Sequence, residues 1–349
     1  MVFGVLTKEA IEGAEKEGKI KLKYRKELSS NNLDLRVKKL FRQKKSMGVI
    51  VISDKEEAFL DLFEEVKTTK GKWYLSPNEF YVAQTIEQLR KKDLFAKITS
   101  RSSWARYGIA CFGITDEFQK PLYFDGNIDF TIKSLGPTVI LRPGDAPAQI
   151  RFSWDCFLPL HIEQIKKIKD YEKIAQESHL NEIGFTLTLD KLIRLYKGGI
   201  IDPKKDCSDL FEEINIENGF IVNPNMFYLG ASQQHIKIPP EYLGYIHLTD
   251  FPSDIVFTSH IVHGNAPFID PYPKFEGKIT FELNPVVPYK IREGMRVTGL
   301  QLIPLCQQHN HDAKLISRYK GQNKAETSKN HLKEKQLELF KEKQLKLFE

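Results

Sequence analysis

Short apolar or alternating segments, separated by glycine and proline turns, recur along most of this chain. Val139–Leu141 is continuously apolar, and polar and apolar residues alternate over Lys278–Phe281. Many short strands with turn signals between them are typical of a β-barrel or jelly roll. The pattern therefore predicts a mainly β fold.

Helical periodicity is found only near the N-terminus and in the segment 161–178, outside the predicted strands. Thr7 can cap a helix that has Ile11 and Ala14 on its apolar face and ends near Gly18. The charged segment 161–178 is predicted to be a helical linker. Neither segment changes the prediction of a β fold.

Two landmarks recur at an interval of about 150 residues, which predicts an internal duplication. Residues 74–81 read YLSPNEFY, and residues 221–228 read IVNPNMFY. Residues 140–152, ILRPGDAPAQIRF, and 290–302, KIREGMRVTGLQL, each predict two strands joined at a tight turn.

Two tandem domains follow from this duplication, with a boundary near residue 180. We call residues 1–180, which include the linker, the first half, and residues 181–310 the second half. Residues 311–349 form a C-terminal arm and a charged tail. Halves of this length are ordinary domain sizes.

The composition excludes some classes of protein but does not identify a ligand. Lys and Arg number 52 against 46 Asp and Glu, and a net charge of +6 is too mild to indicate a polyanionic partner. The four cysteines, Cys111, Cys156, Cys207 and Cys306, are widely separated and form no C-x-x-C pair, so no disulfide framework or zinc site is indicated. Without a membrane span or signal sequence, we expect a cytoplasmic protein.

Residues 101–108 read RSSWARYG and concentrate phosphate-binding chemistry. Arg101, Ser102, Ser103 and Arg106 supply two guanidinium groups and two hydroxyls, and arginine matches phosphate oxygens in a bidentate manner. The alternative interpretation is a helix start with serine caps and solvated arginines.

A second constellation lies at residues 263–283, HGNAPFIDPYPKFEGKITFEL. Glu282 stands within a predicted strand, where a buried carboxylate is costly unless it is used. His263, Ala266 and Asp270 each have a structural alternative, as a hydrogen-bonded histidine, a packing residue and a turn residue.

Both constellations resemble motifs of the dCTP deaminases. RSSWARYG resembles that family's RSSLARLG, and LTKEAIEGAEKEGKI followed by NLDLRV resembles its opening. Residues 263–283 resemble H-x-x-A-x-R-I-D-P-G-[WY]-x-G-x-I-x-L-E-[FL]. The resemblance implies a tandem-duplicated member of the dCTP deaminase/dUTPase superfamily with two dUTPase-like β-barrel or jelly-roll domains.

The resemblance also implies roles for these residues. The serines and arginines of RSSWARYG would hold the triphosphate, and Glu282 would be the general acid/base. The backbone near Ala266 would meet the pyrimidine and Asp270 the sugar, with His263 and Thr280 also at the substrate. Because the H-x-E and P-C-x-x-C signature of zinc deaminases is absent, we expect no catalytic metal, only Mg²⁺ carried by the triphosphate.

Each half lacks one of the two motifs that the other half retains. In the second half, residues 249–254 have acids where the phosphate-binding motif has a serine and an arginine, and in the first half Thr131 stands where Glu282 does. We therefore predict one composite site, with the 101–106 segment facing Glu282. The chain departs from the family at Phe268, which takes an arginine position, and in a longer turn before Gly277.

The C-terminal segment carries two further resemblances. Residues 318–322, RYKGQ, resemble the K-Y-x-x-Q arm that closes over the nucleotide, so Arg318, Tyr319 and Gln322 would contact it; a solvated loop is the alternative. Two pentapeptides, QLELF and QLKLF, resemble the motif that enters the groove of the bacterial sliding clamp; an amphipathic helix on the body is the alternative. The clamp-binding residues would be Gln336, Leu337, Leu339, Phe340, Gln344, Leu345, Leu347 and Phe348.

The sequence thus predicts an enzyme that converts dCTP and water to dUTP and ammonia, as a monomer or small oligomer. A dUTPase or a bifunctional deaminase and dUTPase is the first alternative, with dUTP or dTTP as further ligands. The second is a catalytically weak nucleotide-binding protein tethered to the replication clamp.

Overall fold

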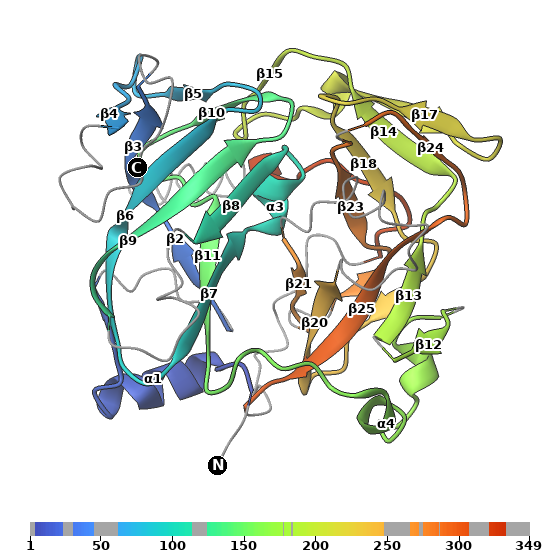
Figure 1. Ribbon diagram of the computed structural model, residues 1–349, viewed down its shortest axis with the longest axis horizontal. Helices are drawn as coiled ribbons and strands as arrows, with labels where there is room; N and C mark the ends of the chain where they lie inside the picture. The colour runs from blue at the N-terminus through green and yellow to red at the C-terminus, as the bar shows by residue number, and fades with distance from the viewer. Residues whose placement is uncertain are drawn as a thin grey trace, which may run out of the picture.

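The protein is described from a computed structural model, in which strands dominate, as predicted (Figure 1). The description covers residues 4–23, 31–44, 62–113, 124–176, 178–182, 184–247, 266–271, 275–285, 287–306 and 321–332. No helix within these ranges is both long and apolar enough to cross a membrane.

The first half is built on one large antiparallel sheet in the order β2-β11-β7-β8-β9-β6-β3-β4, with β1 also paired to β6. Its strands are β1 (Ile20–Lys23), β2 (Leu33–Leu35), β3 (Val37–Gln43), β4 (Phe63–Glu65), β5 (Trp73–Leu75), β6 (Phe80–Lys91), β7 (Phe95–Ser100), β8 (Ile109–Gly113), β9 (Phe124–Ser134), β10 (Thr138–Leu141) and β11 (Ala148–Ser153).

The second half contains two main sheets, ordered β12-β13-β25-β20-β21 and β16-β14-β18-β23. Its strands are β12 (Leu180–Asn181), β13 (Gly184–Thr188), β14 (Leu192–Tyr196), β15 (Ile200–Ile201), β16 (Phe211–Asn215), β17 (Phe220–Val222), β18 (Tyr228–Ala231), β19 (Ile236–Lys237), β20 (Tyr242–His247), β21 (Phe268–Ile269), β22 (Glu276–Gly277), β23 (Thr280–Leu283), β24 (Tyr289–Ile291) and β25 (Arg296–Pro304).

The repeated Pro-Asn-x-Phe-Tyr landmark has the same local structure in both halves. The hydroxyl oxygen of Tyr81 accepts a hydrogen bond of 3.0 Å from the Ser76 amide. The hydroxyl oxygen of Tyr228 accepts one of 3.0 Å from the Asn223 amide. An identical contact at equivalent positions shows that the sequence repeat is also a structural one.

The two predicted tight turns are present, but the strands that they join do not pair with each other. Around the turn at Gly144, β10 pairs with β5 and β15, whereas β11 pairs with β2 and β7. Around the turn at Gly294, β24 pairs with β17 and β25 with β13 and β20. Each turn therefore carries the chain from one sheet to another.

The helical predictions are confirmed in one place and wrong in the other. Helix α1 spans Lys8–Lys16, and the Thr7 hydroxyl caps it by accepting from the Ala10 amide at 3.4 Å. Segment 161–178 is not one helix, because Asp170 takes a left-handed conformation with φ 57°. The segment instead holds two separate helical turns, α4 (Ile162–Ile165) and the 3₁₀ turn η3 (Tyr171–Lys173).

The two halves share a core rather than only touching. Phe227, Leu229 and Ala231, in and beside β18, pack into the hydrophobic cluster of the first half. Burying a side chain such as that of Phe227 contributes about 1.5–3 kcal/mol. The parallel pairing of β10 with β15 adds a continuous backbone connection, so the face of β18 is fixed against the first half.

Candidate active site

Glu282 lies on the face of β23 that is turned toward the first half. In the antiparallel pair with β18, Glu282 is opposite Leu229 and Thr280 is opposite Ala231, both of which belong to the first half's core. The alternate residue Phe281 packs into the core of the second half instead. The strand thus presents Thr280 and Glu282 at the junction of the two halves, beside the short helix α3 (Ser102–Ala105) (Figure 1).

The first half carries threonine at the equivalent structural position, as its sequence predicts. Thr131 on β9 is opposite Val82 on β6, in the same relation that Glu282 has to Leu229. A hydroxyl is a poor base at neutral pH. Among these two equivalent positions, only Glu282 can serve in acid/base chemistry.

The RSSWARYG segment serves both the fold and the site. Trp104 and Tyr107 are buried and meet edge to face, with ring centroids 6.5 Å apart. Ser102 is exposed, whereas Ser103 is 4% exposed and Arg106 6%. The two aromatic residues anchor α3 in the core and so fix where the polar residues lie.

Arg106 is joined to the second half through the C-terminal segment. One of its terminal nitrogens, Nη1, donates to the side-chain oxygen of Gln322 at 3.0 Å and to the backbone oxygen of Glu326 at 3.1 Å. The Gln322 amide nitrogen donates in turn to the Thr280 hydroxyl at 2.6 Å. Three of the predicted site residues, Arg106, Thr280 and Gln322, are therefore brought together.

The carboxyl group of Glu282 is buried, and desolvation raises its pKa from the ordinary 4.5 to about 8. The positive charge of Arg106 opposes this shift, because attraction to a cation favours the carboxylate. A carboxyl group with a pKa near neutrality can both donate and accept a proton, which is the property that general acid/base catalysis requires.

Arg101 is held within the first half. Its Nη1 atom forms an ion pair with Asp34 at 3.1 Å and donates to the backbone oxygen of Ala146 at 3.3 Å. Asp34 belongs to the NLDLRV segment that resembles the family's opening. A phosphate bound by this guanidinium would share it with the Asp34 carboxylate.

Asp270 and Ala266 flank β21 on the second half's other sheet. Both carboxylate oxygens of Asp270 accept from Nη2 of Arg151, a first-half residue, at 3.0 and 2.9 Å. Ala266 precedes Pro267, whose backbone oxygen accepts from the Ile246 amide at 2.7 Å. Arg151 did not figure among the sequence-predicted residues, and an arginine between the apolar residues Ile150 and Phe152 was the signal for it.

The other predicted site residues lie outside the described ranges. They are His263, Arg318, Tyr319 and the eight clamp-motif residues between Gln336 and Phe348. The same holds for residues 249–254, the second-half counterpart of the phosphate-binding motif.

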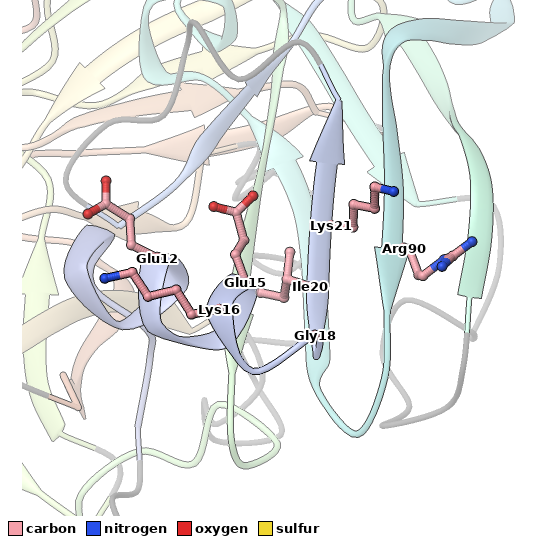
Figure 2. Close-up of a pocket in the computed structure, with 7 residues that line it drawn as sticks. All are labelled: Glu12, Glu15, Lys16, Gly18, Ile20, Lys21 and Arg90. Atoms are coloured by element: carbon pink, nitrogen blue, oxygen red, sulfur yellow. The ribbon is translucent and has the colours of Figure 1, made fainter.

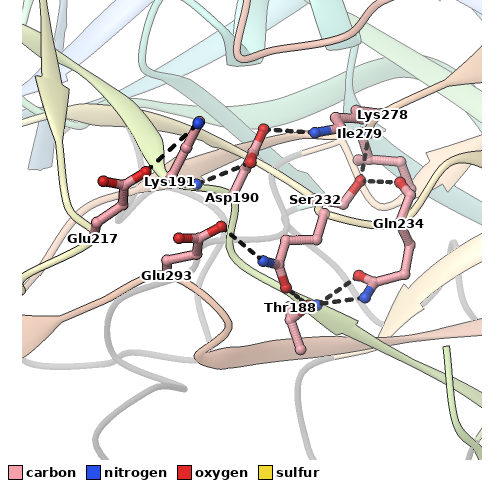
Figure 3. A network of polar contacts seen from close by, with 10 residues as sticks. Thr188, Asp190, Lys191, Glu217, Ser232, Gln234, Lys278, Ile279 and Glu293 are labelled. Carbon is pink, nitrogen blue, oxygen red and sulfur yellow. Dashed lines mark hydrogen bonds and ion pairs between the residues drawn. The ribbon is translucent and has the colours of Figure 1, made fainter. Parts of the chain in front are cut away.

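A polar network holds the segment that enters β23 (Figure 3). The Lys278 ammonium pairs with Asp190 at 2.7 Å. The hydroxyl of Ser232 accepts from the Ile279 amide at 2.9 Å and donates to the backbone oxygen of Gln234 at 2.8 Å. These contacts fix the backbone just before Thr280 and so limit how far Glu282 can move.

A separate groove lies between α1 and strands β1 and β6 (Figure 2). Charges of both signs line it, and none of the predicted site residues does. Its lining residues are Glu12, Glu15, Lys16, Gly18, Ile20, Lys21 and Arg90. The groove is thus distinct from the junction at which Arg106 and Glu282 meet.

A family model described as dCTP deaminase-like matches this chain twice, over residues 5–154 and 160–304. The chain belongs to this family. The two matches fall on the two structural repeats, which confirms the tandem form predicted from the landmarks.

Individual relatives agree with the family. A dUMP-forming dCTP deaminase of Methanobrevibacter smithii is 29% identical over 175 residues, which are 47% of this chain and 86% of that protein. One of Leifsonia xyli is 30% identical over 154 residues, 41% of this chain and 74% of that protein. The crystal structure of 2'-deoxycytidine 5'-triphosphate deaminase from Agrobacterium tumefaciens superposes with a TM-score of 0.74 at 20% identity, over 88% of this chain and 97% of that one. This last likeness concerns the fold, and it extends over both halves.

Proposed function

We propose that this protein deaminates dCTP to dUTP and ammonia at one composite site formed within a single chain. The observation that carries the proposal is the meeting of Arg106 from the first half with Glu282 from the second, in a family of dCTP deaminases. Because each half lacks the group that the other keeps, neither half would perform the reaction alone.

The raised pKa of Glu282 suits the proton transfers of deamination. In the proposed reaction, protonated Glu282 donates to N3 of cytosine, which makes C4 more electrophilic. Water attacks C4 while its proton passes to the Glu282 carboxylate. The carboxyl group returns a proton to the amine, the C4–N bond breaks and ammonia leaves, and the proton of the C4 hydroxyl passes back to the Glu282 carboxylate as the C4 carbonyl forms. One enclosed glutamate thereby acts as acid and base in turn.

The remaining residues would bind and orient the nucleotide. Arg106, with Arg101, Ser102 and Ser103, would hold the triphosphate, whose Mg²⁺ is carried by its own oxygens. Thr280 and Gln322, already joined to Arg106, would close the site around the base. Asp270 would accept from the sugar hydroxyl and the backbone near Ala266 would meet the pyrimidine.

A second candidate is a deaminase that continues to dUMP. The relatives from Methanobrevibacter smithii and Leifsonia xyli carry dUMP-forming names. Such an enzyme would also hydrolyse the bond between the α- and β-phosphates, so pyrophosphate would accompany ammonia.

Separate incubations with dCTP and dUTP, scored for ammonia, pyrophosphate and dUMP, test both candidates. Ammonia and dUTP from dCTP support the proposal, whereas ammonia with dUMP and pyrophosphate supports the second candidate. Glu282→Gln should abolish ammonia release. Glu87→Gln is the control, because Glu87 is also buried but pairs with Arg36 in the first half. Tight dCTP binding by the unaltered protein without ammonia release would overturn the enzyme assignment.

A further inference from the structure

Arg151 crosses from the first half to a predicted substrate residue of the second. It lies on β11 and is 0% exposed, and its Nη2 atom contacts both Asp270 oxygens at 3.0 and 2.9 Å. The guanidinium carbon also lies 4.7 Å from the centroid of the Phe268 ring. Phe268 is the position at which the family motif has arginine, so at this place a guanidinium is supplied by the other half.

The form of this ion pair leaves the Asp270 carboxylate able to accept a further hydrogen bond. Arg151 contacts Asp270 through a single nitrogen, and its Nε and Nη1 atoms have no hydrogen-bond partner within the described part of the chain. The single-nitrogen contact fixes the carboxylate while leaving lone pairs on both of its oxygens.

A neighbouring cation strengthens this interpretation. Lys97 on β7 is directly opposite Arg151 in the sheet, and like charges at such positions repel. The Lys97 ammonium donates to the Tyr245 hydroxyl at 3.0 Å and lies 5.5 Å from the Phe268 ring centroid. Arg151 and Lys97 thus place two cations at the Phe268 ring, and in the described part of the chain Arg151 is the one of the two that pairs with a carboxylate, that of Asp270.

We propose that Arg151 is a positioning residue, which holds the Asp270 carboxylate so that it accepts a hydrogen bond from the 3'-hydroxyl of the deoxyribose. Asp270 keeps 28% of its side chain exposed, so it can reach a ligand while Arg151 stays buried. Arg151 would thereby set the preference for nucleotides that carry this hydroxyl. This inference rests on the proposed function, because it assigns the sugar end of the same site.

The test compares dCTP with 2',3'-dideoxy-CTP, which lacks the hydroxyl, through the ratio of their kcat/KM values. For Arg151→Met we expect kcat/KM for dCTP to fall about tenfold or more, the scale of one charge-assisted hydrogen bond, with little change for the dideoxy substrate. The loss should appear mainly in KM. The ratio is measured on one preparation, so a reduced fraction of folded protein does not alter it.

Arg142→Met is the matched control. Arg142 also joins the halves, with Nη2 at 2.8 and 2.7 Å from the two oxygens of Asp202. Its loss should lower stability without changing the substrate ratio. Arg151→Lys, which retains a cation, should restore part of the preference for dCTP.

A double-mutant comparison separates positioning from a general structural effect. Once Asp270→Asn has removed the acceptor, adding Arg151→Met should not change the ratio further. An unchanged ratio in Arg151→Met, or equal use of both nucleotides by the unaltered protein, would overturn the inference. If the unaltered protein releases no ammonia from dCTP, the proposed function fails instead, and the same ratio is then read from the dissociation constants of the two nucleotides.

Discussion

Arg106 and Gln322, 216 residues apart in the chain, share a buried hydrogen bond of 3.0 Å. Gln322 extends the connection to Thr280 on β23, two residues before Glu282. A first-half helix, a second-half strand and the C-terminal segment therefore meet around one carboxyl group. Because all three belong to a single chain, this arrangement makes a definite prediction about how inactive variants behave together.

Mixing Arg106→Ala with Glu282→Gln should not restore activity. Each variant lacks one component of the proposed composite site, and if that site lies within one chain, the intact component of the other variant cannot replace it. Ammonia release from dCTP is measured for each variant alone and for equimolar mixtures at high concentration. Recovery toward one quarter of wild-type activity would show that sites form between chains.

Activity should depend on pH through the carboxyl group of Glu282. Burial raises its pKa to about 8, and in the proposed reaction the protonated form donates to N3. We therefore expect kcat/KM for dCTP to fall as pH rises through about 8, and Glu87→Gln to show the same profile. A profile that instead rises through this range would mean that the carboxylate is the active form.

The same pKa shift should be visible in stability. In the unfolded chain the carboxyl group has its ordinary pKa of 4.5, so below that pH it is neutral in both states and carries no penalty. Between pH 4.5 and about 8 the unfolded state is favoured by ionisation, and the protein loses on the order of a few kcal/mol. Glu282→Gln should therefore match the wild type in urea unfolding at pH 4 and be more stable at pH 8.5. Equal stabilities at both pH values would contradict a raised pKa.

The sequence predicted those features that depend on local pattern. The Thr7 cap, the β character and the duplication follow from residue spacing, and the position of Glu282 follows from a motif that retains its strand alternation. The correspondence between Thr131 and Glu282 could also be predicted, because it requires only the alignment of the two repeats. These features are set within a few residues of where they occur.

Contacts between residues far apart in the sequence could not be predicted in this way. Arg151 and Asp270 are 119 residues apart, and which acid a buried arginine meets is decided by how two domains pack. The separation of β10 from β11 into different sheets has the same origin, since a turn signal specifies the bend but not the partner strands. The prediction of a single helix over the linker was wrong, because the charged composition of this segment does not reveal that Asp170 adopts a left-handed conformation.

The charged tail should be dispensable for catalysis. Residues 333–349 contain both clamp-like pentapeptides, whereas the contacts described for the C-terminal segment at Arg106 come from Gln322 and Glu326. We expect a chain that ends at residue 332 to keep its kcat and KM for dCTP, and to lose any binding to a bacterial sliding clamp in a titration. Replacing Leu339 and Phe340 by alanine in the full chain is the control for the clamp interaction. Absence of clamp binding by the intact tail would remove the clamp hypothesis.

The docking of the C-terminal segment can be tested at Gly277. A Cβ atom at this residue would lie 2.9 Å from both the backbone nitrogen and oxygen of Gln322, which is closer than packed atoms allow. Gly277→Ala should therefore displace Gln322 and break its bridge between Arg106 and Thr280. We expect KM for dCTP to rise several-fold, and protease cleavage within the C-terminal segment to become faster. Gly144→Ala is the control, because Gly144 also has a positive φ, of 88°, but nothing lies within 4 Å of the added atom. If both variants changed KM equally, backbone strain rather than loss of the bridge would explain the effect.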